Sequence, residues 1–298
     1  MKRPLPGPFL VTGASGNLAR RVIELLLDAA GGPLIATTRD PAKLADLKMR
    51  GVDVRAADFT RPDTLAAAFA GASRVLVVST SDLTPGTRFA SHKAAIDAAV
   101  RASVKHIVYT SLTNPGAGSP ISFANDHAQT EALIAASGVT HTILRNNLYA
   151  DMFLMTAPPA IAMGKLFAAA GEGRVGYVTR EDCARAAVAA LLFAEGSRTL
   201  DITGPGLVGL ADVARTLSDL AKREVTYVPM RPADLHATMV SSGLPAAMAT
   251  VLVSIDEAIA NGTLAITSSA VEDLTGRAPT SVRAFLEAHA SALTAPRS

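Results

Sequence analysis

The chain is poor in the residues that form disulfides and thiolate metal centres. Its only cysteine is Cys183, and it has no tryptophan. A lone thiol excludes an intramolecular disulfide and any cysteine-rich metal site. We therefore predict no metal centre, and we expect Cys183 to be a small buried residue within a helix.

The chain also lacks a large excess of positive or negative charge. The formal net charge is +2, and charged residues make up 18% of the chain. A nucleic-acid partner requires a basic surface that neutralises many phosphates. This balance therefore argues against a nucleic acid as a partner.

Long hydrophobic runs are missing as well. His236–Ile255 lacks Asp, Glu, Lys and Arg, but Ser241, Ser242, Gly243 and Pro245 interrupt it, and these residues spoil a membrane helix. The segment before the first apolar run carries charge without the hydrophobic core and cleavage pattern of a signal peptide. We therefore expect a cytoplasmic protein without a membrane segment.

What the chain does have is a glycine-containing turn near its start. The segment Val11-Thr-Gly-Ala-Ser-Gly-Asn-Leu-Ala19 follows a short apolar run and opens a helical stretch. Gly13 permits a sharp exit from a strand, Gly16 lets the backbone approach a pyrophosphate, and the small Ala19 keeps helix and strand close. The helix N-terminus then faces the phosphates. On its own this spacing is a weak signal, because such turns are common between strands and helices.

The next apolar run strengthens the interpretation of that turn. It spans residues 33–39 and ends in Thr37, Thr38 and Arg39, with Lys43 one helical turn later. An enzyme that prefers NAD would offer an Asp or Glu here to the adenosine ribose. Two cations suit a 2′-phosphate instead, which favours NADPH over NADH. The alternative interpretation is that Arg39 and Lys43 only solvate a helix start.

Strand and helix patterns alternate through the first half of the chain. This alternation predicts a Rossmann-type, doubly wound parallel sheet of the α/β class, with a ligand crevice at the carboxyl ends of its strands. The predicted strands are 9–12, 34–38, 52–56, 74–79, 106–111 and 141–145. The predicted helices are 18–29, 41–49, 62–70, 88–102 and 126–137.

After Arg145 the alternation gives way to an apolar segment over 152–170, which two prolines and a glycine interrupt. We predict an NADP-binding Rossmann domain over residues 1–150, completed by strands within 174–203. Residues 151–298 are predicted to form a smaller C-terminal α/β lobe that covers the substrate. Later strands are expected at 174–178, 199–203 and 225–228, and a helix at 181–193.

The fifth predicted strand ends in Ser111, which would point into the crevice. In hydride-transfer enzymes of this architecture a Ser or Thr there orients the substrate carbonyl. A Tyr with a Lys four residues on, aligned on one face of the next helix, is the usual proton donor. This chain has Phe123 and His127 at that spacing. His127 could hold the acceptor oxygen or relay a proton, or it could be a helix-surface histidine that caps a loop.

The missing Tyr/Lys pair favours one class of acceptor. Hydride delivery to an ordinary ketone makes an alkoxide, whose conjugate acid is about as weak as water, whereas delivery to a quinone makes a phenolate, whose conjugate acid has a pKa of roughly 10. The difference of ~6 units corresponds to about 8 kcal/mol that the protein need not supply by proton transfer. Quinones and similarly activated acceptors can therefore be reduced without a Tyr acid.

Further polar candidates follow the sixth predicted strand, where donors would meet a ligand. They are Asn146, Asn147 and Tyr149. Alternatively, the two asparagines form a turn and Tyr149 belongs to the core. Four apolar residues could form the walls of a pocket for an aromatic ring, or they could pack in the core. They are Met152, Phe153, Met155 and Met163.

Several segments follow one another along the chain in a distinctive order: Val11-Thr-Gly-Ala-Ser-Gly-Asn-Leu18, Arg39-Asp-Pro-Ala-Lys43, Tyr109-Thr-Ser-Leu112, His127-x-x-Thr-Glu131 and Thr142-Ile-Leu-Arg-Asn146. Together they resemble the NmrA-like, atypical short-chain dehydrogenase/reductases. The likeness is strongest to the type 2 NAD(P)H:quinone oxidoreductases, with triphenylmethane reductase as a near relative. It extends to Ser242-Gly-Leu-Pro245 and Thr275-Gly-Arg-Ala-Pro-Thr280.

The resemblance implies NADPH in the crevice and direct hydride transfer to a quinone or similar conjugated acceptor, without flavin. It places Asn146 and Tyr149 beside the nicotinamide and acceptor and His127 at the family's helix position; with Ser111 these are the candidate catalytic residues. The expected cofactor-binding residues, including the turn residues Gly16 and Leu18, are Gly13, Ser15, Gly16, Asn17, Leu18, Arg39, Lys43, Asp58, Phe59 and Ser79.

One departure leaves the identity of the acceptor open. A member of the family shows Asn-Gly-Trp-Tyr where this chain has Asn146-Asn-Leu-Tyr149, so an aromatic wall is lost. We expect a small aromatic or quinone-like substrate and a monomer or homodimer.

Two other functions compete with a quinone reductase. A non-catalytic NmrA-like regulator that senses NADP(H) would also lack the Tyr/Lys pair, and a pathway-specific reductase would act on an enone or imine. The apolar segment 152–170 favours the enzyme, because a sensor needs no pocket for a second ligand.

Overall fold

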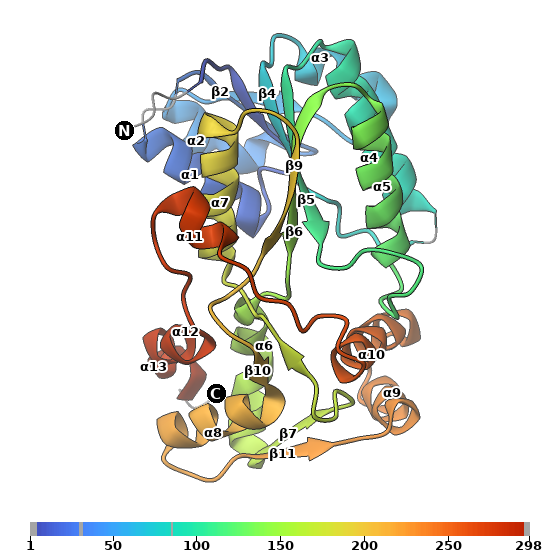
Figure 1. The fold of residues 1–298 in the computed structure, drawn as a ribbon, viewed down its shortest axis with the longest axis vertical. Helices are drawn as coiled ribbons and strands as arrows, with labels where there is room; N and C mark the ends of the chain where they lie inside the picture. The colour runs from blue at the N-terminus through green and yellow to red at the C-terminus, as the bar shows by residue number, and fades with distance from the viewer. Residues whose placement is uncertain (1–4, 30–31, 85, 295–298) are drawn as a thin grey trace.

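A computed structural model describes residues 5–29, 32–84 and 86–294; residues 1–4, part of the segment expected to lack a signal peptide, lie outside it. Its centre is a seven-stranded sheet in the order β3-β2-β1-β4-β5-β6-β9 (Figure 1), with every neighbouring pair parallel. The strands are β1 (Phe9–Val11), β2 (Leu34–Thr38), β3 (Asp53–Ala56), β4 (Arg74–Val77), β5 (His106–Leu112), β6 (Thr140–Asn146) and β9 (Arg198–Ile202). This order confirms the Rossmann-type fold predicted from the alternation.

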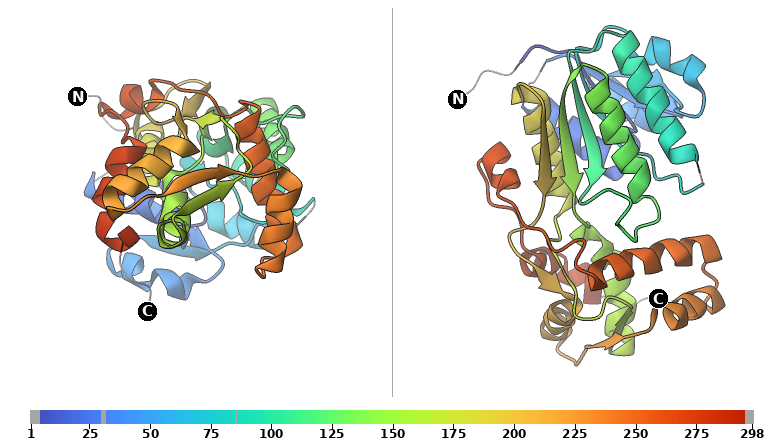
Figure 2. Two further views of the ribbon diagram at one scale, coloured as in Figure 1. Left: turned by 90° about the horizontal axis from the view of Figure 1, so that it is seen from below. Right: turned by 45° about the vertical axis from the view of Figure 1, so that its right-hand side comes forward.

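Helices cover both faces of the sheet. Figures 1 and 2 show α1, α7 and α11 on one face and α3, α4 and α5 on the other. Because both faces are covered, a central strand such as β1 is apolar and buried at every position. The elements around the sheet are α1 (Asn17–Asp28), η1 (Pro41–Leu44), α2 (Ala45–Met49), η2 (Pro62–Thr64), α3 (Leu65–Phe69), α4 (Thr87–Arg101), α5 (Ala124–Ala136), α7 (Arg180–Phe193) and α11 (Ala270–Thr275).

Beyond the carboxyl edge of the sheet lies a second packed region (Figure 1). Its core includes Leu166, Leu217, Ile259 and Phe285 and is separate from the cores that flank the sheet. Its elements are η3 (Ala150–Met152), α6 (Phe153–Met163), β7 (Lys165–Ala168), β8 (Arg174–Val175), β10 (Val208–Gly209), α8 (Leu210–Ala221), β11 (Thr226–Pro229), α9 (Pro232–Ser241), α10 (Ala246–Ala260), α12 (Val282–Ala288) and α13 (Ala290–Thr294). The domain boundary at residue 150 stays a prediction.

The two strands expected within 174–203 have different partners. β9 pairs with β6 and forms one edge of the main sheet. The segment expected as a strand over 174–178 is shorter, because only Arg174–Val175 is extended as β8, and it pairs with β10 in a separate antiparallel pair. Beyond β8, the backbone of Gly176 instead binds Gly204, whose N–H donates to the Gly176 carbonyl at 3.1 Å.

The apolar segment 152–170 does not present its large side chains as one surface. Phe153 is buried, with its ring centroid 5.0 Å from that of Tyr177. Met155 and Met163 are 78% and 58% exposed. The prediction of core packing is therefore confirmed for Phe153, whereas these two methionines are surface residues of α6.

The uncharged stretch 236–255 is divided between two helices. It covers the second half of α9, the turn at Ser242–Pro245, and most of α10. Across the residues that the structure describes, no helix is long and apolar enough to span a bilayer. Cys183 is buried in α7, as predicted.

Arg74, at the start of β4, is a buried arginine with a structural role. Its guanidinium donates to the carbonyl oxygens of Leu191, Ala190 and Ala194 at 2.5, 3.1 and 2.7 Å. These carbonyls lie at the C-terminus of α7, where the helix dipole favours a cation. Arg74 therefore anchors α7 to the sheet.

After β9 the backbone of Gly204 lies close to that of Tyr177, and Gly206 provides a matched control for testing this contact. A Cβ on Gly204 would lie 2.0 Å from the Tyr177 carbonyl oxygen, whereas one on Gly206 would meet nothing within 4 Å. We expect Gly204→Ala to lower the free energy of unfolding by about 1–3 kcal/mol and Gly206→Ala to change it by less than about 0.5 kcal/mol. Urea unfolding measures both changes. Equal effects would show that the contact between Gly204 and the Tyr177 backbone leaves room for a side chain.

Candidate functional site

The candidate site lies where the strands of the main sheet end. The carboxyl ends of β1, β2, β4, β5 and β6 reach the edge that faces the second region (Figure 1). Ligands of doubly wound sheets bind at this edge, because side chains that follow different strands meet there. Most of the predicted site residues lie in the segments that leave it.

The glycine turn between β1 and α1 has the geometry of a phosphate site. Gly13 has a φ of +64°, in the left-handed region that favours glycine. The Gly16 N–H donates to the Gly13 carbonyl at 2.8 Å. α1 then begins at Asn17 with no side-chain cap and no acidic residue in its first turn, so its first N–H groups can bind an anion. The side chain of Leu18 is buried in the core, so Leu18 can contact a ligand only through its backbone.

The end of β2 combines unpaired cations with an unpartnered buried hydroxyl. The Thr38 hydroxyl donates to Ser15 Oγ at 3.2 Å and ties β2 to the glycine turn. Thr37 is 1% exposed, and its Oγ1 has no hydrogen-bond partner. Arg39 and Lys43 are exposed, and within the described residues neither side chain makes a hydrogen bond or ion pair. Both cations are therefore available to a ligand.

Asp58 and Phe59 follow β3, next to that cationic end. Asp58 Oδ1 accepts hydrogen bonds from the Thr60 N–H and hydroxyl at 2.9 and 2.8 Å. Burial disfavours the charge of Asp58, but the bonds from Thr60 and the charge of Arg39 outweigh it and hold its pKa below its ordinary value. Phe59 is partly buried against the core on the α3–α5 face. A negative charge therefore stands near Arg39 without pairing with it.

The ends of β4 and β5 each carry a serine. The Ser79 N–H donates to Thr110 Oγ1 at 2.9 Å, which fixes the end of β4 against β5. The Ser111 hydroxyl donates to Glu131 Oε1 at 2.6 Å, and Glu131 is ion-paired to Arg145 at 2.6 Å. A serine has one O–H to donate. Ser111 therefore offers lone pairs to a ligand rather than the donor expected for orienting a carbonyl.

Asn146 and Tyr149 meet at the end of β6. Asn146 Nδ2 donates to the Tyr149 hydroxyl at 3.1 Å, whereas Asn146 Oδ1 is buried without a partner. The neighbouring Asn147 is structural, since its amide donates to the Leu264 carbonyl at 3.0 Å. Burial raises the pKa of Tyr149, although the charge of Arg180 opposes the rise. Tyr149 is thus a neutral phenol.

His127 is buried in a different cluster. It is 3% exposed, so the interpretation as a helix-surface histidine is wrong. Its Nδ1 lies 2.8 Å from the Tyr109 hydroxyl, which lies 3.2 Å from His92 Nδ1, and its Nε2 lies 3.5 Å from Arg88 Nη1. Burial and the charge of Arg88 hold the pKa of His127 well below its ordinary value. It is therefore neutral at physiological pH and has no imidazolium proton to give.

The predicted catalytic residues thus fall into three clusters. Asn146 and Tyr149 touch each other, whereas the contacts of Ser111 lead to Glu131 and those of His127 lead to Tyr109. Glu131, which joins Ser111 to Arg145, was not among the residues predicted for the site. Helical spacing could have found it, because the buried positions of α5 recur at intervals of three and four and include Ala124, His127, Thr130, Glu131 and Ile134.

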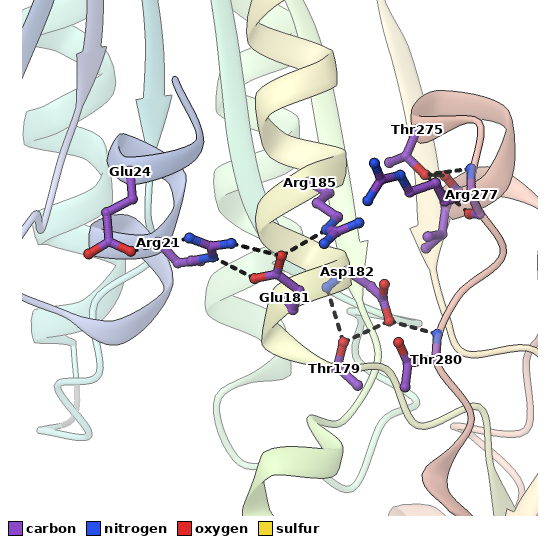
Figure 3. Close-up of polar contacts among 10 residues, drawn as sticks. Arg21, Glu24, Thr179, Glu181, Asp182, Arg185, Thr275, Arg277 and Thr280 are labelled. Carbon is purple, nitrogen blue, oxygen red and sulfur yellow. Dashed lines mark hydrogen bonds and ion pairs between the residues drawn. The ribbon is translucent and has the colours of Figure 1, made fainter. Parts of the chain in front are cut away.

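A set of polar contacts holds α1 and α7 together beside the phosphate turn. Figure 3 shows Arg21 of α1 donating to Glu181 of α7, through Nε at 2.6 Å and Nη2 at 3.1 Å. The buried carboxylate of Asp182 accepts from the Thr179 hydroxyl at 2.7 Å and the Thr280 N–H at 2.9 Å. The late motif that ends at Thr280 therefore anchors the C-terminal segment to the start of α7.

A hollow of about 360 Å³ opens beside the ends of β5 and β6. The amide of Asn114 closes one side of it by donating to the Thr263 carbonyl at 2.7 Å. The four apolar residues considered as walls for an aromatic ring are not in its lining. That lining is polar or small, and consists of Asn114, Pro115, Gly116, Gly118, Ser119, Arg145 and Thr263.

The residues at this edge fit a phosphorylated dinucleotide. Buried oxygens without partners are costly, and two of them, Thr37 Oγ1 and Asn146 Oδ1, lie at the ends of β2 and β6. The N-terminus of α1 lies between these strand ends and suits a pyrophosphate. Arg39 and Lys43 would hold a 2′-phosphate, and Asn146 Oδ1 would accept from a carboxamide N–H.

Comparison with known proteins agrees with this geometry. Residues 13–193 match the model of a family described as NAD(P)H-binding. Quinone oxidoreductase 2 of Escherichia coli is 34% identical over 91% of this chain and 95% of its own. An NAD(P)H azoreductase of Xenophilus azovorans is 31% identical over 96% of this chain and 99% of its own.

Solved structures show the same fold. The crystal structure of the E. coli NADPH-dependent quinone oxidoreductase complexed with NADPH has a TM-score of 0.89 and 33% identity, covering 94% of this chain and 99% of that one. The triphenylmethane reductase of Citrobacter sp., complexed with NADP(H), has a TM-score of 0.88 and 30% identity, covering 94% and 99%. The chain therefore belongs to the NAD(P)H-binding family, as its sequence motifs indicated.

Proposed function

We propose that this protein is an NADPH-dependent oxidoreductase that passes hydride directly to a quinone or a similar conjugated acceptor, without flavin. The observation that carries the proposal is the pair of unpartnered buried oxygens, Thr37 Oγ1 and Asn146 Oδ1, at two strand ends with the N-terminus of α1 between them. The relatives support the reaction class, because their names describe reductases of quinones, azo compounds and triphenylmethane dyes.

The residues of the chain have distinct tasks in this proposal. The glycine turn and the first N–H groups of α1 bind the pyrophosphate, and Arg39 with Lys43 binds the 2′-phosphate. Asn146 orients the nicotinamide, which supplies the hydride. The amide of Asn146 also holds the Tyr149 oxygen, which leaves the phenol O–H free to donate to the acceptor.

The proposed proton source for the product is water rather than a side chain. Burial keeps His127 neutral and keeps Tyr149 protonated, so neither is tuned as an acid near neutral pH. An acceptor that stabilises its own anion suits such a site. A simple ketone does not, because its alkoxide needs a strong proton donor.

The main competing function is a regulator that senses NADP(H). The surface position of Met155 and Met163 weakens the argument from an apolar pocket that had favoured an enzyme. The likeness to reductases along almost the whole chain now favours catalysis. A reductase of enones or imines uses the same cofactor site and differs only in its acceptor.

The direct test is NADPH oxidation by protein whose visible spectrum shows no bound flavin. We expect NADPH to be consumed with benzoquinone or a naphthoquinone, and simple ketones to be inert. Turnover only with an added enone or imine would favour the pathway-specific reductase. Tight NADPH binding by calorimetry without consumption of NADPH would contradict the proposal and favour a regulator.

Arg39→Asp tests the cationic end of β2. Loss of a charge-assisted contact to the 2′-phosphate costs about 1.5–3 kcal/mol, so the preference for NADPH over NADH should fall at least about tenfold. Lys105→Asp is the matched control, because Lys105 is an exposed cation just before β5, at the opposite edge of the sheet. An unchanged ratio of NADPH to NADH affinity in Arg39→Asp would remove this residue from the phosphate site.

A further inference from the structure

Arg88, near the start of α4, is a buried cation without a counter-ion. It is 6% exposed, and no carboxylate lies within ion-pair distance of it among the residues described. Its Nε donates to the Asp82 carbonyl at 3.2 Å, and Nη1 lies 3.5 Å from His127 Nε2. Nη2 has no acceptor within the described part of the chain. A buried charge is costly unless it is paired or hydrogen-bonded.

The other deeply buried arginine shows what a satisfied guanidinium looks like here. Arg74, at 7% exposed, places its Nε and Nη2 on three backbone carbonyls at the end of α7. Among the described residues, the Arg88 guanidinium donates to one backbone carbonyl, that of Asp82. It also lies at the carboxyl edge of the sheet, because α4 begins after the loop that leaves β4. Within the described residues, Arg88 Nη1 reaches only His127 Nε2, at 3.5 Å, and Nη2 has no acceptor, so its donors are less fully used than those of Arg74.

The Arg88 guanidinium lies against the start of α5. Its guanidinium carbon lies 4.6 Å from the centre of the Phe123 ring. Phe123 and His127 stand at the spacing where the sequence lacks a Tyr/Lys pair. The Arg88 guanidinium, which α4 supplies, therefore lies beside the two positions where the Tyr and Lys would stand. Asp82 and Asp126 attract it from beyond ion-pair distance, while burial lowers its pKa.

We propose that Arg88 is a catalytic residue: its guanidinium donates a hydrogen bond to the acceptor oxygen and stabilises the negative charge that this oxygen gains. The inference rests on the proposed function and names the group that stabilises the developing negative charge where the Tyr/Lys pair is missing. In the reaction the nicotinamide C–H bond breaks, and its hydrogen with the electron pair forms an O–H bond at one quinone oxygen. The negative charge develops on the other oxygen, to which Arg88 donates, and the product is the hydroquinone monoanion. The cofactor is oxidised to NADP⁺, and water supplies the proton that completes the hydroquinone.

Binding of a phenolate tests this role without turnover. The probe is 4-nitrophenol, titrated by its absorbance in the presence of the NADP⁺-loaded protein. A nearby cation lowers the pKa of an acid by about one unit or more, so the bound phenol should ionise at lower pH than the free phenol. Arg88→Gln should abolish this shift, whereas Arg88→Lys, which keeps the charge, should retain part of it.

Acceptor dependence gives an independent kinetic readout. Removing one oxyanion donor costs about 100-fold or more in rate. In Arg88→Gln the loss of rate should be greatest for quinones whose hydroquinone anions are the strongest bases. It should be smallest for quinones whose hydroquinone anions are the weakest bases. A merely structural role would lower all rates equally. The control is Arg74→Gln, which should lower the melting temperature without changing phenolate binding or the order of acceptors.

The outcomes separate the possible ligands of Arg88. An unchanged phenolate shift in Arg88→Gln, or no phenolate-selective binding by the wild type, overturns the proposal. Weaker NADPH binding by calorimetry with an unchanged phenolate shift would assign the guanidinium to a cofactor phosphate and also overturn it. If Arg88→Gln fails to fold, Arg88→Lys decides by the same titration. A wild type that binds phenolate but reduces no acceptor would refute the proposed function, and Arg88 would then be a binding group for an anionic oxygen rather than a catalytic residue.

Discussion

The site depends on buried polar groups that the chain itself leaves unpaired at one edge of its sheet. An unsatisfied buried donor or acceptor costs about 1–3 kcal/mol, and Thr37 Oγ1 and Asn146 Oδ1 are two such groups. Parallel strands bring these ends to the same edge, and the N-terminus of α1 adds unpaired N–H groups between them. A dinucleotide that contacts all three would repay this cost on binding.

Charge is distributed along that edge in a way that limits the chemistry. Exposed cations stand at the end of β2, and a buried cation, Arg88, stands beside α5. Burial, with the charge of Arg88, lowers the pKa of His92 to about 3 and holds that of His127 well below its ordinary value. The neighbouring histidines are therefore hydrogen-bonding groups rather than acids. Such a site suits an acceptor whose reduced form is already a weak base.

Much of the fold could be predicted from the sequence, because it follows from local patterns. The alternation of apolar strands and helices gave six strands of the main sheet, and the glycine spacing gave the turn before α1. The pairing of β8 with β10 could not be predicted, since two extended residues carry no recognisable period. The surface position of Met155 was missed because α6 is apolar on more than one face.

The site was harder to predict than the fold, because its contacts join residues far apart in sequence. Residue types identified Asn146 and Tyr149, and their mutual hydrogen bond follows from their spacing at the end of β6. Nothing in the segment Thr-Arg-Phe-Ala at the start of α4 distinguishes Arg88 from a surface arginine. Its burial depends on how α4 packs against α5, which the sequence does not specify.

The most direct measurement is a crystal structure of this protein with NADPH. We expect the pyrophosphate at the N-terminus of α1, the 2′-phosphate within hydrogen-bond distance of Arg39 or Lys43, and the carboxamide on Asn146 Oδ1. A nucleotide bound elsewhere, or one whose adenosine points away from the end of β2 while Asn146 Oδ1 stays without a partner, would contradict this expectation.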